Sequence, residues 1–372
     1  MKKLIYSLIL ILISGSLLGQ TQYVSKVWVS DLGNGRYKNP VLYADYGEPD
    51  VCRVGNDFYM VSSSYTSVPG LPILQSKDLV NWKIIGYGLE RLAPEEMFSI
   101  PQHVCGIYAP SIRYNKGEFF IYYCIPEFGI YMIKTTDMKK GWEAPVLVMG
   151  GKGYVNPCPI WTEDGKAYLL YGFDGECTGI KNIIAIIELK PDGKETIGVG
   201  TVIYDGHEKN EDLDGAKIVK KNDYYYIFSS AGKSESLSWL LALRSKNIFG
   251  PYEEKIAMFQ SKTNIGGPYK GAFVETPGGE SWFVHTQGLK NFGKPVLLSP
   301  IKWENGWPII GGYNSSGSGE PIQNYKKPAI AQSVLENPVE SDEFDGDKLG
   351  LQWQWSANRN PFWYYLDQNS KQ

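Results

Sequence analysis

The sequence predicts an all-β fold, a five-bladed β-propeller followed by a short, truncated β segment. The first observation is a pattern that recurs five times: a turn-like start, a few mostly apolar residues, a polar or glycine-containing turn, and an aromatic-rich strand. The copies read EPDVCRVGNDFYMVSS from Glu48, APSIRYNKGEFFIYY from Ala109, NPCPIWTEDGKAYLLY from Asn156, DGAKIVKKNDYYYIFSS from Asp214 and YKGAFVETPGGESWFVHT from Tyr269. Their first residues are 61, 47, 58 and 55 positions apart. Repeats of roughly 40–60 residues with several strands each indicate the blades of a propeller.

The second observation is another hairpin-like element that follows several of these copies. It reads QSKDLVNW from Gln75, KTTDMKKGW from Lys134 and RSKNIFGPY from Arg244, with a weaker copy, ELKPDGKE, from Glu188. Two hairpins per unit predict four-stranded blades over about residues 30–325, and no long helical periodicity interrupts them.

The two ends of the chain differ from the repeats. Residues 1–19 are predicted to be a signal peptide, because Lys2 and Lys3 precede a short apolar stretch and small residues follow it. This stretch is too short for a membrane span, so we expect export to the periplasm or the extracellular space without stable membrane insertion. Residues 326–372 are predicted to be a linker and the truncated start of a β-sandwich module, too short to bury a core alone.

Net charge and aromatic content indicate which classes of binding partner to expect. The formal net charge is −3, the pI is near 5.8 and no basic patch stands out, which argues against a nucleic-acid partner. Aromatic residues make up 14% of the chain. Most of these rings are expected to pack between sheets and a few to line a sugar-binding cleft, because flat rings with a polar tip suit pyranose faces. The sequence leaves the oligomeric state open.

Two carboxylates begin different copies of the repeat, Glu48 and Asp214. If the blades circle one axis, both should face the same central pocket. Such a pair is what glycosidic hydrolysis needs: one group protonates the leaving oxygen while the other activates water, roughly 6.5–9.5 Å away in an inverting enzyme. The alternative is a pair of solvated turn residues.

The motifs resemble glycoside hydrolase family 43. The resemblance covers about residues 38–315 and is carried by YADYGEPDVCRVGNDFYMVSS, YAPSIRYNKGEFFIYY, NPCPIWTEDGKAYLLYG, DGAKIVKKNDYYYIFSSAG, GGPYKGAFVETPGGESWFVHTQ and WPIIGG. The terminal SDEFDGDKLGLQWQW is similar to the first strands of the sandwich attached to some β-xylosidases of that family. The resemblance implies a five-bladed propeller and inverting hydrolysis of β-xylosides, α-L-arabinofuranosides or related linkages in an oligosaccharide or polysaccharide.

The resemblance also implies catalytic roles. Glu48 stands where the family has an aspartate base, Asp214 stands where it has a glutamate acid, and Asn156 replaces a second aspartate that orients the acid. The residues expected to contact substrate are Gln75, Tyr108, Trp239, Tyr269 and Lys294. No cofactor is expected. The sequence leaves a central metal ion open, because Tyr269, a poorer ligand than imidazole, replaces the histidine that can hold such an ion in the family.

These exchanges predict weak or altered catalysis. Both carboxylates are displaced relative to a bound sugar, and a shift of ~1 Å can cost on the order of 100-fold in rate. Without a charged neighbour at Asn156, the pKa of Asp214 should be lower and the group a poorer proton donor. Two readings follow: a glycosidase with a displaced acid/base pair, or a non-catalytic carbohydrate-binding propeller. Neighbouring carboxylates such as Asp50 and Asp212 are weaker candidates to replace the pair.

Overall fold

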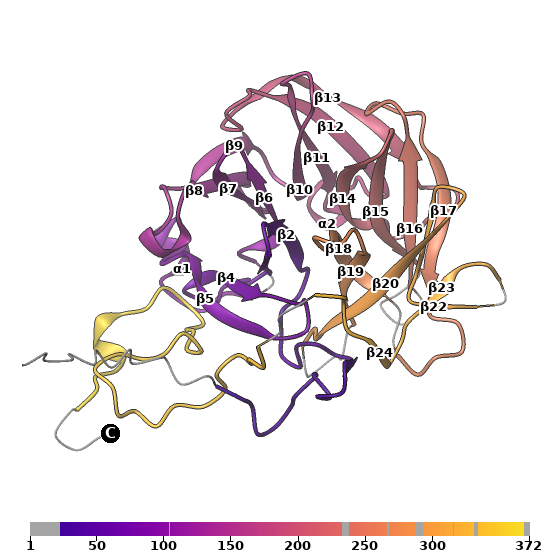
Figure 1. Cartoon of the computed structure of the whole chain (residues 1–372). Coiled ribbons are helices and arrows are strands. Elements are labelled where there is room, and N and C mark those ends of the chain that lie inside the picture. Colours follow the sequence, from indigo (N-terminus) through magenta and orange to yellow (C-terminus); the bar gives the residue numbers. More distant parts are fainter. Residues whose placement is uncertain are drawn as a thin grey trace, which may run out of the picture.

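Five sheets, each with four antiparallel strands that are consecutive in the chain, follow one another in chain order around a common centre (Figure 1). This computed structural model describes residues 23–103, 105–232, 238–265, 268–287, 293–314, 316–330 and 334–367. The predicted signal peptide lies outside the described residues. The all-β, five-bladed propeller prediction is confirmed.

Each sheet is built from four consecutive strands. The first holds β2 (Asp50–Val54), β3 (Asp57–Val61), β4 (Gly70–Ser76) and β5 (Trp82–Leu89), and the second β6 (Tyr108–Asn115), β7 (Glu118–Ile125), β8 (Gly129–Thr135) and β9 (Val146–Gly150). The third holds β10 (Tyr154–Trp161), β11 (Ala167–Phe173), β12 (Ile183–Leu189) and β13 (Thr196–Asp205). The fourth holds β14 (Asp214–Lys221), β15 (Tyr224–Gly232), β16 (Ser238–Ser245) and β17 (Glu253–Phe259), extended by β23 (Gly319–Glu320) and β22 (Gly312–Tyr313). The fifth holds β18 (Tyr269–Glu275), β19 (Ser281–Thr286), β20 (Val296–Glu304) and β21 (Trp307–Ile310).

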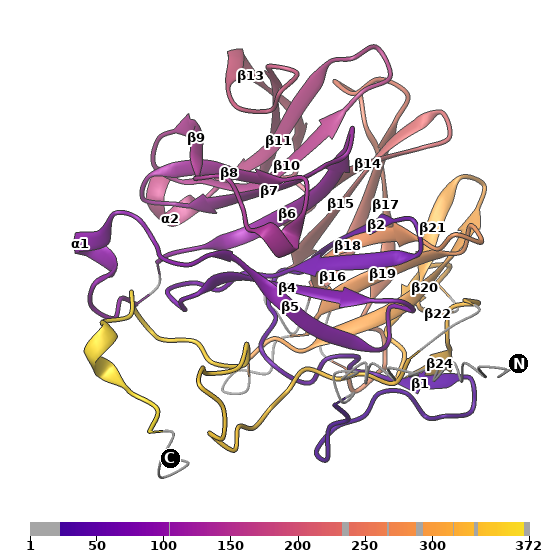
Figure 2. The same cartoon turned by 60° about the vertical axis from the view of Figure 1, so that its left-hand side comes forward.

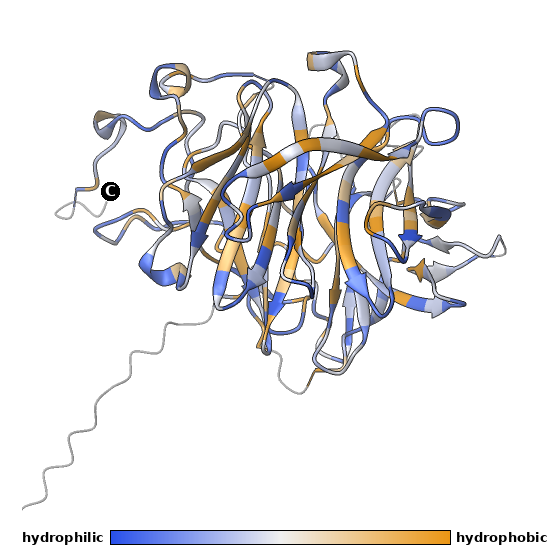
Figure 3. Ribbon diagram, turned by 90° about the horizontal axis from the view of Figure 1, so that it is seen from above, coloured by the Kyte–Doolittle hydropathy of each residue, from blue (hydrophilic) through white to orange (hydrophobic). Residues whose placement is uncertain are grey.

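Tight hairpins connect neighbouring strands within a blade. The turn between β6 and β7 is Lys116-Gly117, with φ of 49° and 90°, and the turn between β20 and β21 is Asn305-Gly306, with φ of 51° and 74°. Positive φ at both central residues matches the twist of the flanking strands, which explains the asparagine and glycines at these turns. Hydrophobic and hydrophilic residues alternate along many of the strands (Figure 3), as expected for blades that pack face to face.

The ring closes where the fifth blade packs on the first, without a shared strand. Phe58 and Met60 of the first blade join Val274 and Trp282 of the fifth in one buried cluster. The segment before the first blade also helps, because the backbone N–H groups of residues 41 and 42 donate to the carbonyl of Val296 on β20 at 2.8 and 3.3 Å. Outside the blades, β1 (Arg36–Lys38) pairs with β24 (Asn324–Lys326).

The inner strands share a backbone feature that turns them toward the centre. Within two residues of the start of each inner strand, one residue has a positive φ: Glu48 (55°), Ala109 (44°), Asn156 (56°), Gly215 (70°) and Lys270 (43°). In four of the five blades the strand register also shifts there. The predicted equivalence of Asp214 and Tyr269 with Glu48 is therefore wrong by one residue. Gly215 and Lys270 hold the equivalent backbone positions, so Lys270 becomes a central residue.

The tail, residues 334–367, runs along the first blade (Figure 2). Val68 and Trp355 exchange backbone hydrogen bonds of 2.8 and 2.7 Å, and the Asn358 side chain bonds both the N–H and the carbonyl of Leu92. Among these described tail residues no named strand forms, and the one helical turn is η3 (Pro361–Trp363).

The other helices among the described residues are short. They are α1 (Glu95–Phe98), η1 (Met138–Lys140) and α2 (Gly175–Thr178). In the described part of the chain, no helix has the length and apolar character needed to cross a bilayer.

Candidate active site

A pocket of about 850 Å³ lies at the centre of the propeller, lined by the first residues of the inner strands and by the loops around them. Six of the predicted site residues line it: Glu48, Tyr108, Asn156, Asp214, Tyr269 and Lys294. The repeat therefore brings residues from all five blades to one hollow.

Glu48 lines the central pocket and is only 4% exposed. One carboxylate oxygen accepts hydrogen bonds from the Ser63 hydroxyl at 2.5 Å and the Ala109 N–H at 2.7 Å. The other oxygen contacts the ammonium of Lys270. Burial by itself would raise the pKa of Glu48, but the charge of Lys270, with hydrogen bonds from Lys270 and Ser63, outweighs burial and lowers it to about 2.

Lys270 is the residue that sequence reasoning missed. Its Nζ contacts Glu48 and lies 2.8 Å from Asp214 Oδ2, so one buried ammonium bridges both carboxylates. A Cβ on Gly215 would stand 2.5 Å from the Lys270 side chain, so the glycine leaves room for the lysine to reach the centre. The two negative neighbours outweigh burial and raise the pKa of Lys270 well above its usual value, which keeps it charged.

Asp214 sits across the ammonium from Glu48. Its Oδ1 accepts hydrogen bonds from Asn156 Nδ2 and the Gly215 N–H, both at 2.7 Å, and its Oδ2 accepts one from the Tyr269 hydroxyl at 3.2 Å. Burial raises the pKa of Asp214, but Lys270 more than offsets burial, and the Asn156 amide lowers the pKa further. Asp214 is therefore held ionised, in the direction expected from Asn156, although the lysine contributes more than the asparagine does.

The distance between the two carboxylates is shorter than the distance found in inverting glycosidases. Because both contact one nitrogen, their nearest oxygens lie nearer than the roughly 6.5–9.5 Å that leaves space for a water. The Lys270 ammonium occupies the gap between them. Water and a sugar oxygen can enter this gap only if the lysine side chain moves aside.

The pocket centre does not suit a metal ion. The Lys270 ammonium already supplies a positive charge to both carboxylates, and Tyr269 donates its hydroxyl to Asp214. In the described part of the chain, no three His, Cys, Asp or Glu side chains cluster in a way that could hold a metal ion.

Two predicted substrate contacts are not made at this pocket. Gln75 lies on β4, where its amide donates to Asp57 at 2.9 Å, and Trp239 lies on β16, where its indole donates to Asn210 at 3.1 Å. Neither lines the central pocket. Asp50 does not replace either acid, since it pairs with Arg113 between the inner strands.

The loops contribute further pocket residues that carried no motif signal. They are Tyr65, Glu127, Asp174, Glu176 and Lys181. Glu127 has a buried carboxylate oxygen without a hydrogen-bond partner among the described residues, which leaves it able to accept a ligand hydroxyl.

Comparison with known proteins relates this chain to one family of carbohydrate-cleaving enzymes. Residues 37–308 match the family model described as glycosyl hydrolases family 43. The chain is 36% identical over 335 residues to a protein of Xylanibacter ruminicola and 32% identical over 364 residues to a β-xylosidase of Formosa agariphila; each alignment covers 90% of this chain and 61% or 60% of the relative. A non-reducing end α-L-arabinofuranosidase of Bacteroides ovatus is 29% identical over 359 residues, covering 91% of this chain and 65% of the relative.

Solved structures agree with the family model. The GH43 protein BlXynB from Bacillus licheniformis matches with a TM-score of 0.71 at 28% identity, over 88% of this chain and 65% of that one. The chain spans about three-fifths of the length of the first curated relatives. On the family model and these relatives together, this chain belongs to glycosyl hydrolase family 43.

Proposed function

We propose that this chain is a glycoside hydrolase that removes terminal xylosyl or arabinofuranosyl units from plant-type oligosaccharides or polysaccharide side chains, with inversion and with low turnover at neutral pH. The observation that carries the proposal is the pair of carboxylates, Glu48 of the first blade and Asp214 of the fourth, which line one sugar-sized pocket. The substrate class follows the β-xylosidase and α-L-arabinofuranosidase names of the relatives.

The proposed chemistry divides two roles between these groups. Asp214, when protonated, gives its proton to the glycosidic oxygen, and Glu48 takes a proton from the water that attacks the anomeric carbon from the other face. Lys270 must swing out of the gap for both steps. Asn156 positions Asp214 through its 2.7 Å hydrogen bond and supplies no proton.

The lowered pKa values predict an acidic optimum. Glu48, with a pKa of about 2, is an ionised base at almost any pH, whereas Asp214 is protonated only below the ordinary aspartate range. Hydrolysis of nitrophenyl β-xyloside should therefore rise as the pH falls from 7, with a maximum below about pH 4. Activity should vanish in Glu48→Gln and Asp214→Asn. An optimum near neutrality would contradict this assignment.

A second candidate is carbohydrate binding without turnover. The Lys270 bridge favours it, because an ammonium between two ionised carboxylates opposes both the acid and the base role. In that case, calorimetry should detect micromolar binding of xylo- or arabino-oligosaccharides while no nitrophenol is released at any pH from 3 to 8. Binding should weaken in Tyr108→Ala, which removes a ring from the pocket wall.

The place of action is part of the same proposal. Lys2, Lys3 and the short apolar stretch after them support export. Expression of the full chain in a Gram-negative host, followed by N-terminal sequencing of the periplasmic fraction, tests it: a mature chain beginning near Gln20 is expected.

A further inference from the structure

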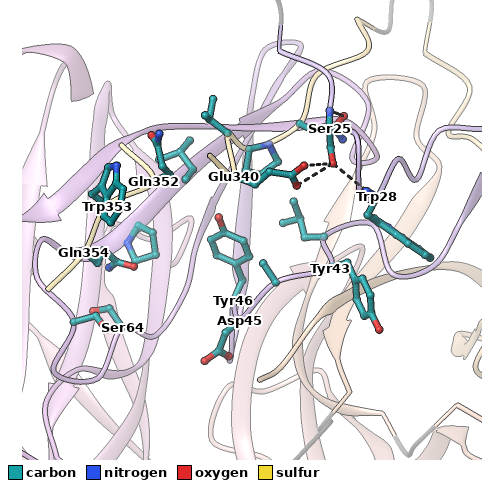
Figure 4. Close-up of a pocket in the computed structure, with 18 of the residues that line it drawn as sticks. Ser25, Trp28, Tyr43, Asp45, Tyr46, Ser64, Glu340, Gln352, Trp353 and Gln354 are labelled. Atoms are coloured by element: carbon teal, nitrogen blue, oxygen red, sulfur yellow. Dashed lines mark hydrogen bonds between the residues drawn. The ribbon is translucent and has the colours of Figure 1, made fainter. Parts of the chain in front are cut away.

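A second pocket, of about 500 Å³, lies beside the first blade, where three distant parts of the chain meet. The N-terminal segment brings Ser25 and Trp28, the segment before the first blade brings Tyr43 to Tyr46, and the tail brings Glu340 and Trp353 (Figure 4). Tyr65 lines both this pocket and the central one, so the two adjoin.

Aromatic rings stand on two sides of this second pocket. Tyr43 is 55% exposed and lies 4.9 Å from the Trp28 ring, while Trp353, 37% exposed, stands on the opposite side (Figure 4). Their polar tips are already used: the indole of Trp28 donates to the Pro40 carbonyl and that of Trp353 to Asp342, at 2.8 Å each. The Lys38 ammonium lies 4.0 Å from the centre of the Trp28 ring, so Trp28 mainly supports Tyr43. The exposed ring surface of Tyr43 and Trp353 is available to a ligand, and the hydrogen bond to Asp342 fixes Trp353 without a large ordering cost on binding.

Polar groups converge between the rings. Tyr46 is only 9% exposed, and its hydroxyl points into the pocket toward Glu340 with no hydrogen-bond partner among the described residues (Figure 4). Glu340 accepts the Ser25 hydroxyl at 2.8 and 2.9 Å and keeps further lone pairs that two neighbouring ligand hydroxyls could use. Burial raises the pKa of Tyr46, so its hydroxyl stays a donor.

Charge limits what can bind. The lining includes two carboxylates, Asp45 and Glu340, and no lysine or arginine, which disfavours an anionic ligand. The central pocket, in contrast, holds Lys181, Lys270 and Lys294. A neutral ligand with apolar faces and vicinal hydroxyls matches the rings, the lone Tyr46 hydroxyl and the Glu340 carboxylate together.

We propose that this pocket is a second, non-catalytic binding site for a neutral pentose or hexose unit of an oligosaccharide. The site would hold an oligosaccharide beside the central pocket, and its role does not depend on hydrolysis in the central pocket. Only the choice of a xylan fragment as the probe rests on the proposed function.

The test is calorimetric titration of xylohexaose in the Asp214→Asn background, which should not cleave the probe. The double variant Tyr43→Ala/Trp353→Ala should bind at this site at least about tenfold more weakly. Tyr46→Phe, which removes one oxygen and keeps the ring, should weaken it about fivefold. Tyr313→Ala serves as a matched control, because that tyrosine is 63% exposed on β22 and lines neither pocket.

The outcomes separate the two sites. If the central pocket does not bind sugar, the xylohexaose binding that calorimetry still detects belongs to the second pocket. That binding should be lost in the double variant Tyr43→Ala/Trp353→Ala. If the double variant and Tyr46→Phe both bind xylohexaose within twofold of their background, the second site is overturned, whatever the central pocket does. Trigalacturonate should bind this site at least tenfold more weakly than xylohexaose, and equal affinity would overturn the argument from charge.

Discussion

Replacing Lys270 with glutamine is expected to move the pH optimum of hydrolysis from acid toward neutrality and to raise the rate at pH 6–7 on the order of 100-fold. The reason is electrostatic. Without the ammonium, the buried Glu48 and the partly buried Asp214 become two neighbouring carboxylates, and such a pair keeps one shared proton to a higher pH. That proton supplies the acid which the native site lacks at neutral pH. The measurement is the pH profile of kcat/KM on nitrophenyl β-xyloside.

The same substitution should reverse the dependence of stability on pH. In the native protein the pKa values of both carboxyls are below their unfolded values, so their stabilising contribution is present above about pH 4 and is lost as the pH falls through the folded pKa values. In Lys270→Gln at least one pKa is raised, so stability should instead fall as the pH rises above the unfolded value. At pH 7 the loss should be about 3 kcal/mol, because a buried charge loses its partner.

Lys302→Gln is the control for both measurements, because that lysine is 70% exposed and pairs with Glu304 on the surface. It should leave the optimum and the melting temperature nearly unchanged. Should Lys270→Gln show no hydrolysis at any pH while remaining folded and binding sugar, the hydrolase proposal fails and the binding reading replaces it.

The fold could be predicted because each blade is formed from one contiguous stretch of chain. Turn residues such as Lys116-Gly117 and alternating apolar residues repeat with each blade, so local sequence carries the architecture. The convergence of Glu48 and Asn156 also followed from the repeat, because equivalent positions on a ring face one centre. Asp214 reaches the same pocket from the residue before its equivalent position, Gly215.

Lys270 could not be placed, because a one-residue shift of register decides which side chain points inward. In three copies the inward residue precedes a proline: Glu48, Ala109 and Asn156. The last two copies lack that proline, so the sequence aligned Tyr269, and not Lys270, with them. The absence of this proline in the last two copies is the signal that could have shown that their register was uncertain by one residue.

Other features depend on contacts between distant segments. Trp239 does not line the central pocket, because a ring on a blade strand can face either a neighbouring blade or the pocket, and its partner Asn210 lies on a loop. The second pocket joins Ser25 to Glu340. No local sequence pattern predicts this contact between two segments that are 315 residues apart.

Asp50→Ala is expected to destabilise the whole propeller by about 3–5 kcal/mol. Asp50 on β2 is 1% exposed, and its Oδ2 accepts the Arg113 guanidinium at 2.5 Å and the Ile112 N–H at 2.7 Å, both on β6. Arg113 in turn donates to the Cys158 sulfur on β10. One carboxylate therefore links the inner strands of the first three blades, and its loss leaves a largely buried guanidinium without its counter-ion.

Urea unfolding of Asp50→Ala beside Glu304→Ala separates this buried pair from a surface one. Glu304 pairs with the exposed Lys302 at 2.6 Å, so its removal should cost no more than about 1 kcal/mol. Adding Arg113→Met to Asp50→Ala should recover part of the loss, because the uncompensated charge disappears with the arginine. If Asp50→Ala costs no more than the surface control, the inner strands are held by packing alone, and the buried ion pair contributes nothing to the ring that positions Glu48 and Asp214.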